Sequence, residues 1–352
     1  MILENISLKN YRNIEFAEIA ADKNMNIICG DNAQGKTNLI EAIWLLTGTK
    51  SFRGAKENEI IKFSSEKAII NAKVFSHGLE SEIKIEIGEK KTFFVNGKKA
   101  NGTDLLEKFN AIVFSPNDIS LVYGEPSFRR KFLDVSICQI YPKYAQYLKN
   151  YARALTQRAS ILKESKNDAS LKFFLDDFEN ELVKNGEKII EYRRRYLKKL
   201  LFYAPDIYHD LSGKKEKIDI EYLCSVKSDF LSELKANRKE DILKGATSVG
   251  PHRDDMVFLI NGKRAKEFSS QGQKRSIALT LKLASAQILK EITGEQPVAL
   301  LDDVMSELDK TRQDYILNHI SNWQVFLTCC EKAHFENLAK GKIFSVKNGE
   351  IT

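Results

Sequence analysis

The sequence lacks both a long hydrophobic run and a regular cysteine framework. A membrane-spanning helix needs roughly 20 consecutive apolar residues, and no run in the chain approaches that length. The start, MILEN, has neither the basic segment nor the cleavage site of a signal peptide. The five cysteines form no C-x-x-C pair, which argues against a zinc site and against disulfide staples. These absences predict a cytoplasmic protein with buried, reduced thiols and no membrane partner.

The composition that remains is that of a globular protein. The 352 residues are 43% hydrophobic and 29% charged, which is enough for one large core or two ordinary ones. The formal net charge of +7 fits a polyanionic partner, although charge alone is weak evidence and needs support from motifs.

Residues 30–37 read GDNAQGKT and have the spacing of a phosphate-binding loop. The apolar run 25–29 predicts a strand before the loop, and apolar residues at helical spacing over 39–46 predict a helix after it. Successive backbone N–H groups of such a loop surround an anion, while lysine and threonine add an ammonium and a magnesium-binding hydroxyl. A chance match in an ordinary loop is the alternative. We therefore predict an ATP site with Mg²⁺ formed by Gly30, Asp31, Asn32, Ala33, Gln34, Gly35, Lys36 and Thr37.

A second part of the same site is indicated by the apolar run 298–301, which ends in two carboxylates. Asp302 is expected to hold Mg²⁺ through water, and Asp303 to orient or deprotonate the attacking water. Paired acids at a strand end can also be surface residues. Arg12, on the turn after a first predicted strand, could reach the nucleotide or could simply be solvated.

Residues 269–275 form a small-residue turn before a helical run and predict a second anion site. Ser270 and Gly272 would suit a γ-phosphate, yet residues 30–37 already supply a loop for that end of ATP. A second protomer resolves this redundancy, so we expect an ATP-dependent homodimer.

The periodicity elsewhere predicts an α/β fold with a helical insertion. Alternating residues predict strands over 3–8, 14–19, 68–75, 83–87 and 218–223, and the dipeptides at 96–97 and 261–262 predict hairpins. Residues 144–162 and 171–196 have heptad spacing and predict a short antiparallel helical arm, which Pro205 and the basic run 214–217 are expected to end. Arg158 and Asn185 interrupt its apolar seam. A further helix is expected near 230–243.

Together, residues 30–43, 269–275 and 300–309 resemble the ABC-type ATPase heads of the SMC-like class. The shorter motifs at 10–13, 51–53, 114–116, 126–134 and 250–254 resemble, more narrowly, the RecF family of DNA replication and repair proteins. The resemblance implies an ABC-type head with an antiparallel β subdomain over 1–122 and 244–352, and a helical lobe with an arm over 123–243.

The same resemblance implies a function. It identifies Lys36 and Thr37 as Walker A ligands, Ser270 and Gly272 as the signature motif, and Asp302 and Asp303 as the Walker B pair. The expected protein is a weak, DNA-stimulated ATPase whose heads dimerise around ATP on double-stranded DNA, at gaps and junctions and possibly on single strands. RecO and RecR would be its partners in loading RecA.

The chain departs from the usual head pattern at three places. Ala33 replaces a frequent glycine, and Asp303 stands where ABC heads generally have glutamate. Thr328, Cys329 and Cys330 follow the strand after which transporter heads place a switch histidine, while Asn117 and Asp118 stand near the expected Q-loop. An ABC subunit of another system, or an SMC-like interaction protein with a slow or inactive ATPase, are the alternative functions.

Two basic clusters are suited to DNA phosphates. One lies in the second arm helix and the other near residue 130, and a solvated helical face is the alternative for both. Nothing resembles a recognition helix, so no base readout is expected. The predicted DNA contacts are Arg193, Arg194, Arg195, Lys198, Arg129 and Arg130.

Overall fold

The computed structural model describes residues 1–166, 169–330 and 341–352. The chain forms two compact units, which are described separately. The head unit contains Met1–Asp118 and Ala278–Thr352, and the arm unit contains Ile119–Ile277. The family-based domain limits at 122 and 244 remain a prediction. No helix in the described part of the chain combines the length and apolarity needed to cross a bilayer.

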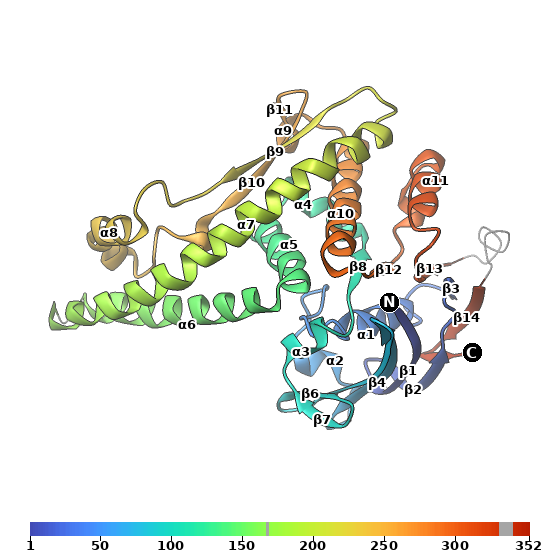
Figure 1. Ribbon diagram of the computed structural model, residues 1–352. Coiled ribbons are helices and arrows are strands. Elements are labelled where there is room, and N and C mark those ends of the chain that lie inside the picture. The colour runs from blue at the N-terminus through green and yellow to red at the C-terminus, as the bar shows by residue number, and fades with distance from the viewer. Residues whose placement is uncertain (167–168, 331–340) are drawn as a thin grey trace. The chain divides into compact units, whose positions relative to one another are not determined.

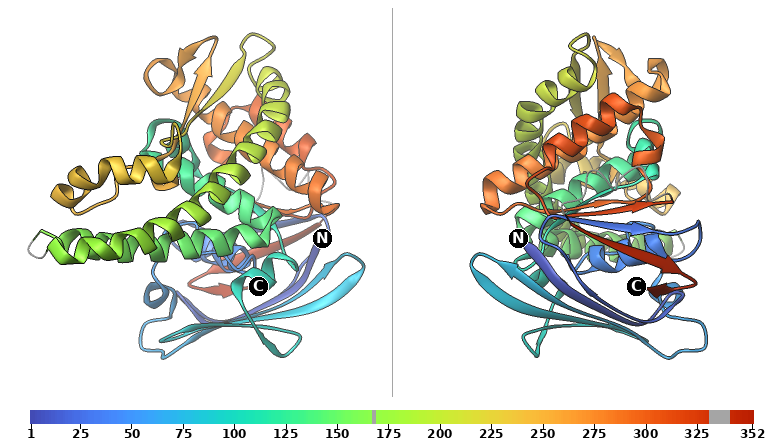
Figure 2. Two further views of the ribbon diagram at one scale, coloured as in Figure 1. Left: turned by 60° about the vertical axis from the view of Figure 1, so that its left-hand side comes forward. Right: turned by 90° about the vertical axis from the view of Figure 1, so that its right-hand side faces the viewer.

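The first sheet of the head unit is antiparallel, with the strand order β2-β1-β4-β5-β6-β7. Alternating buried and exposed residues give one packed face and one open face, as in β4, where every second side chain is buried. Figure 2 shows this curved sheet in two views. The predicted strands and the hairpin at 96–97 are confirmed, with bounds β1 Ile2–Tyr11, β2 Ile14–Ala20, β4 Ala68–Ser76, β5 Leu79–Ile87, β6 Lys91–Val95 and β7 Lys98–Ala100.

The second sheet of the head unit has the order β15-β14-β3-β13-β12-β8, and all its strands except β15 run parallel. Short, continuous apolar runs form its centre, as expected for strands covered on both faces. Because parallel strands end at one edge, the loop after β3 and the acids after β12 lie at the same edge. The bounds are β3 Met25–Cys29, β8 Ala111–Phe114, β12 Val298–Leu301, β13 Val325–Cys329, β14 Gly341–Lys347 and β15 Glu350–Ile351.

The helix α1 (Lys36–Leu45) contacts β1 of the first sheet and β12 and β13 of the second (Figure 1). Its apolar side chains Leu39, Ile40 and Ile43 are fully buried, which confirms the predicted helix and its packed face. The helix therefore fixes the phosphate loop to the core of the head unit. The other helical segments are α2 Glu57–Ile60, α3 Gly102–Leu106, η1 Pro116–Ile119, η4 Met305–Glu307 and α11 Lys310–His319.

The arm unit is built on two long helices, α6 (Pro142–Glu164) and α7 (Leu175–Leu211), which pack side by side (Figure 1). This confirms the predicted helix pair. A three-stranded sheet of order β11-β10-β9 packs against α7 through β9. The remaining bounds are α4 Ser120–Tyr123, α5 Pro126–Ile140, η2 Ala169–Phe174, β9 Ile218–Leu223, α8 Phe230–Lys244, η3 Pro251–Arg253, β10 Asp255–Ile260, β11 Lys263–Arg264 and α9 Ala265–Phe268, with α10 (Gln271–Thr293) running on into the head unit.

The expectation that Pro205 helps to end the arm is wrong, because α7 continues through it to Leu211, whereas the basic run 214–217 does follow the helix. A proline inside a helix costs about 3 kcal/mol through a lost hydrogen bond and a clash. Beyond it, Ile207, Tyr208 and Leu211 are buried, and each buried side chain contributes about 1.5–3 kcal/mol. Packing of the last turns therefore outweighs the local penalty.

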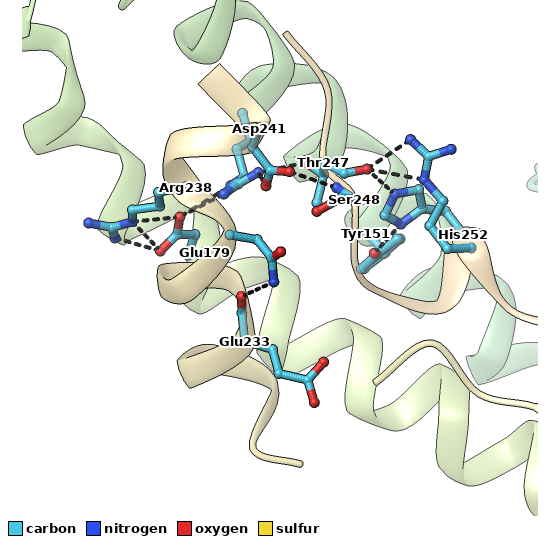
Figure 3. Close-up of polar contacts among 11 residues, drawn as sticks. Tyr151, Glu179, Glu233, Arg238, Asp241, Thr247, Ser248 and His252 are labelled. Carbon is cyan, nitrogen blue, oxygen red and sulfur yellow. Dashed lines mark hydrogen bonds and ion pairs between the residues drawn. The ribbon is translucent and has the colours of Figure 1, made fainter. Parts of the chain in front are cut away.

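Both polar interruptions of the arm have hydrogen-bond partners, and Asn185 Nδ2 donates to the backbone oxygen of Glu181 at 2.8 Å and to its Oε2 at 3.2 Å. Arg158, fully buried, pairs with Glu179 at 2.9 Å and with Asp241 at 2.7 Å. Figure 3 shows the continuation of this network, in which Glu179 also accepts from Arg238 and Asp241 accepts from the backbone N–H of Ser248. The network joins α6, α7 and α8 by charge as well as by apolar packing.

Candidate nucleotide site

The phosphate loop connects β3 to α1, as predicted. Gly35 has φ 122°, a backbone conformation that residues other than glycine rarely adopt. The Nζ atom of Lys36 donates to the backbone oxygens of Gly30 at 2.7 Å and Asp31 at 3.1 Å. The ammonium is thus held inside the curl of the loop, where it can neutralise a bound phosphate.

Ala33, the departure from the frequent glycine, has φ 65°. The left-handed region costs a non-glycine residue about 1–2 kcal/mol in the folded state. In the opposite direction, glycine makes the unfolded chain more flexible, which lowers the stability of the fold by about 0.4–1 kcal/mol. We expect Ala33→Gly to stabilise the protein by about 0.5–1 kcal/mol, measured by urea unfolding. Ala42→Gly, in the helical α1, is the control and should destabilise. A loss of stability in Ala33→Gly would contradict this account of the loop.

Two neighbouring turns hold the loop from outside. The backbone oxygen of Gln34 accepts from Asn13 Nδ2 at 2.9 Å and from the N–H of Gly349 at 3.0 Å. The side-chain oxygen of Gln34 accepts from the N–H of Asn348 at 2.5 Å. A Cβ at Gly349 would lie 2.3 Å from the backbone oxygen of Asn13. The turn between β14 and β15 therefore approaches the backbone of Asn13, in the turn after β1, as closely as only glycine permits.

The Walker B carboxylates meet the phosphate loop at the edge of the parallel sheet. Thr37 Oγ1 donates to Asp302 Oδ1 at 2.8 Å. Thr328, at the end of β13, has its hydroxyl 3.0 Å from Asp303 Oδ1 and 3.4 Å from Asp302 Oδ1. The predicted metal ligands Thr37 and Asp302 are thus brought together, and Thr328 contacts both acids.

Burial, helped by the charge of Asp303, raises the pKa of Asp302 to about 6, although the hydrogen bond from Thr37 acts to lower it. A divalent cation would favour the ionised carboxylate. A hydroxyl and a carboxylate are hard oxygen ligands, which suit Mg²⁺ when water and phosphate oxygens complete its octahedron. Among the described residues no cluster of three or more His, Cys, Asp or Glu could hold a metal alone. The donor set therefore fits a magnesium ion shared with a nucleotide.

A cavity of about 550 Å³ opens over the loop. Arg12, predicted to reach the nucleotide, lies in its wall, where Glu41 holds its guanidinium. Sequence reasoning did not assign Asn13, Asn38 or Arg53 to the site, although all three stand in the motifs that carry the family resemblance. The lining residues are Arg12, Asn13, Asn32, Ala33, Gly35, Lys36, Thr37, Asn38, Arg53, Glu59, Ile61 and Asp303.

The expectation of buried thiols holds for Cys29, Cys224 and Cys329, holds in part for the half-buried Cys138, and is wrong for Cys330, which is exposed. Its Sγ lies 3.5 Å from Lys36 Nζ and 3.2 Å from Asn32 Oδ1. A vicinal pair at a strand end places its two side chains on opposite faces. One thiol therefore enters the core and the other borders the phosphate loop.

The predicted signature motif lies in the arm unit, at the start of α10. The Oγ of Ser270 accepts from the N–H of Gln273 at 3.2 Å, and the N–H of Ser270 donates to Gln273 Oε1 at 2.7 Å. These are the two reciprocal bonds of a capping box. Ser270 therefore orders the first turn of α10, and its contact with ATP remains a prediction.

Two of the predicted DNA contacts are not supported by their positions. Arg193 is buried and pairs with Asp134 at 2.9 Å, and Arg129 is buried and pairs with Asp255 at 2.6 Å. A buried, paired guanidinium cannot reach a phosphate without breaking that pair, so both residues hold the arm unit together instead. Arg130 is half-buried and donates to the backbone oxygen of Asp254 at 2.8 Å.

The exposed members of the basic cluster lie together. Arg194, Arg195 and Lys198 on α7, with Lys227 of the loop after β9, line a cavity of about 600 Å³. Arg195 also stacks over the ring of Tyr141 at 5.2 Å. The spacing of Arg194, Arg195 and Lys198 at i, i+1 and i+4 places them on one side of a helix. Arg193 lies on the other side, in the apolar stripe of α7, so this pattern could have separated the exposed residues from the buried one.

Comparison with known proteins shows the family of the chain. A family model described as RecF/RecN/SMC N terminal domain matches residues 2–352. A DNA replication and repair protein RecF from Lactobacillus johnsonii is 41% identical over 376 residues, covering 100% of this chain and 99% of the relative. The corresponding protein of Clostridium kluyveri is 39% identical over 363 residues, covering both chains fully at 100%.

Solved structures give the same result. A structure described as the recombination mediator protein RecF–ATP in the RecFOR pathway is 37% identical, with a TM-score of 0.92, and the match covers 99% of this chain and 96% of that one. A Smc head domain from Pyrococcus furiosus, 17% identical with a TM-score of 0.56, shares the fold alone. Since the family model and the full-length relatives agree over the whole chain, the protein belongs to the RecF family of DNA replication and repair proteins and has its ABC-type ATPase head.

Proposed function

We propose that the protein is an ATP-dependent DNA-binding ATPase of recombinational repair, whose two heads close around ATP on double-stranded DNA. The observation that carries the proposal is the contact between Thr37 and Asp302, at 2.8 Å, beside Lys36. It unites the Walker A and Walker B ligands in one site. RecO and RecR would be its partners in loading RecA, in keeping with the RecFOR pathway to which the solved relative belongs.

Each residue of the site has a separate task in hydrolysis. Lys36 and the loop amides neutralise the phosphates, and Thr37 and Asp302 would hold Mg²⁺, which supplies charge neutralisation for the transferred phosphoryl group. Asp303 orients the attacking water and accepts its proton. Thr328, whose hydroxyl contacts both acids, fixes their orientation. A weak hydrolysis rate, stimulated by DNA, is part of the proposal.

Assay of ATP hydrolysis with and without DNA separates this function from that of an interaction protein with an inactive site. Turnover that depends on Lys36 supports the ATPase, and its absence in the wild-type protein would favour the inactive alternative. A different ABC system is disfavoured, because the relatives matching the full chain are RecF proteins.

Mixing two inactive variants tests whether ATP is shared between protomers. Lys36→Ala removes the phosphate-loop cation, and Ser270→Arg blocks the signature turn, so each homodimer has no complete site. A mixed dimer keeps one intact loop facing one intact signature. At equal amounts, we expect phosphate release at about a quarter of the wild-type rate, because half of freely exchanging dimers are mixed and each holds one site. No recovery at any protein concentration would contradict a site shared in trans.

The exposed basic face of the arm unit is the proposed DNA contact. Reversing Arg194, Arg195 and Lys198 to glutamate should weaken binding to all DNA sequences and lower the slope of log affinity against log salt by about 3. The matched control reverses Lys9, Lys98 and Lys99, which are exposed on the head unit, and should leave most of the affinity. Equal losses in both triple variants would show a general charge effect without a defined contact.

A further inference from the structure

One carboxylate of the head unit has no role in the function described above. Glu41 lies in the second turn of α1 and is fully buried. Burying an ionised carboxylate costs several kcal/mol unless its oxygens are paired and hydrogen-bonded. The donors that offset this cost come from elements other than α1, namely Tyr11 and Arg12 at the end of β1 and Ser51 in the loop after α1.

Four donors converge on this carboxylate. Its Oε2 accepts from Arg12 Nε at 2.7 Å and from the Tyr11 hydroxyl at 3.2 Å. Its Oε1 accepts from Arg12 Nη2 at 2.9 Å and from the Ser51 hydroxyl at 2.5 Å. Burial acts to raise the pKa of Glu41, but the bonds from Arg12 and Ser51 outweigh it and lower the pKa overall. The group is therefore an anion at neutral pH, with all its principal acceptor positions filled.

Arg12 is fixed by more than this pair. Its backbone has φ 53°, and its N–H donates to the oxygen of Ile60 at 2.7 Å. Its Nη1 donates to the oxygen of Glu59 at 3.1 Å. A guanidinium has five N–H groups, and these bonds use three of them (Nε, Nη1 and Nη2). Because Arg12 lines the cavity over the phosphate loop, its remaining donors can reach a ligand there.

A second arginine is tied to the same carboxylate. Arg53 lines the cavity, and its Nη1 lies 3.9 Å from Glu41 Oε2 and donates to Asn38 Oδ1 at 2.9 Å. The hydroxyl of Ser51, which donates to Glu41, also accepts from the backbone N–H of Arg53 at 3.1 Å. Glu41 thus connects the turn after β1 and the loop after α1 to the helix that carries the phosphate loop.

We infer that Glu41 is a positioning residue, which holds Arg12 and Arg53 in the cavity wall so that they contact the phosphate chain of the nucleotide. The inference rests on the proposed function, since it assigns a further part of the same ATP site. Planar guanidinium groups suit phosphate oxygens, and a side chain already fixed before binding loses little entropy when the ligand arrives. Glu41 itself touches no ligand and acts through the two arginines.

The sign of one substitution separates positioning from simple electrostatics. Glu41→Gln removes a negative charge close to the phosphate site, so by Coulomb's law alone it should tighten the binding of an anion. If Glu41 positions Arg12, the same change should weaken ATP binding. The amide nitrogen of glutamine cannot accept a hydrogen bond, so the guanidinium of Arg12 loses one of the two bonds that hold it. We expect the Kd for ATP to rise about tenfold.

The experiment measures ATP affinity by calorimetry for wild-type protein, Glu41→Gln, Arg12→Gln and the double variant. If Glu41 acts through Arg12, the two losses do not add, and the double variant binds within about threefold of Arg12→Gln. Glu66→Gln, the same change at an exposed glutamate of the head unit, is the matched control and should bind as the wild type does. Thermal unfolding of each variant shows whether it is folded.

Each result decides one question. Unchanged or tighter ATP binding by a folded Glu41→Gln protein overturns the positioning role, and so does a double variant whose losses multiply. If Glu41→Gln does not fold, Ser51→Ala and Tyr11→Phe, which each remove one bond to the intact carboxylate, must weaken ATP binding by about threefold, and no change in either overturns the inference. Failure of the wild-type protein to bind ATP would instead refute the proposed ATPase, which keeps the two failures distinct.

Discussion

Replacing Arg158 by methionine is expected to lower the free energy of unfolding by about 3–5 kcal/mol. The guanidinium donates to Glu179, to Asp241 and to the hydroxyl of Thr247 at 2.8 Å, and both carboxylates are fully buried. Removing the guanidinium leaves the buried carboxylate of Asp241 charged. That carboxylate then keeps its hydrogen bond from the backbone N–H of Ser248. Glu179 keeps Arg238 (Figure 3), so most of the loss is expected to come from Asp241.

Urea unfolding of the full chain, followed by hydrogen exchange of the amides of α6 and α7, measures this effect where it arises. Arg153→Met, an exposed arginine earlier on the same helix, is the matched control and should change stability by less than about 0.5 kcal/mol. Adding Asp241→Asn to Arg158→Met should recover part of the loss, because it removes the unpaired charge. Equal stability of Arg158→Met and Arg153→Met would show that the buried pair contributes nothing.

The same polar network marks where sequence reasoning stops. Heptad spacing correctly predicts that Arg158 and Asn185 face the seam of the arm, because the period fixes which side of a helix is buried. It cannot say which acids reach them. The partner of Arg193 is 59 residues away in sequence and that of Arg129 is 126 residues away. Both arginines therefore looked like solvated or DNA-binding residues until the folded chain supplied their carboxylates.

More of the ATP site than of the arm's polar network could be predicted from the sequence, because the parts of the phosphate loop are close together in the chain. The loop needs a strand, glycines and a helix within about 20 consecutive residues, and each leaves a signal in composition. Glu41 also left a signal, a single acid on the apolar face of α1, but nothing in the sequence showed that Arg12 and Ser51 would neutralise it. The contact of Gln34 with the turn at 348–349 joins the two ends of the chain, and no local pattern indicates it.

Asp303→Asn is the second change with a large expected effect, a loss of about a hundredfold or more in the rate of ATP hydrolysis. The amide cannot accept a proton from water, so the base is lost. The structure indicates that little else changes. Asp303 has φ 51°, a conformation that asparagine adopts as readily as aspartate. In the wild-type protein, Asp303 Oδ1 accepts from the Thr328 hydroxyl at 3.0 Å, and the amide oxygen of asparagine can accept the same bond.

Because binding and hydrolysis are separated in this variant, it should reveal the closed state. ATP binds a dimer that shares it better than it binds a monomer, so it shifts the population toward the dimer until hydrolysis removes the bridging phosphate. We expect Asp303→Asn to elute as an ATP-dependent dimer in size-exclusion chromatography with light scattering, and Lys36→Ala to stay monomeric in the same buffer. A monomeric Asp303→Asn protein with bound ATP would contradict ATP-driven closure. If the variant hydrolysed ATP at the wild-type rate, Asp303 would not be the base.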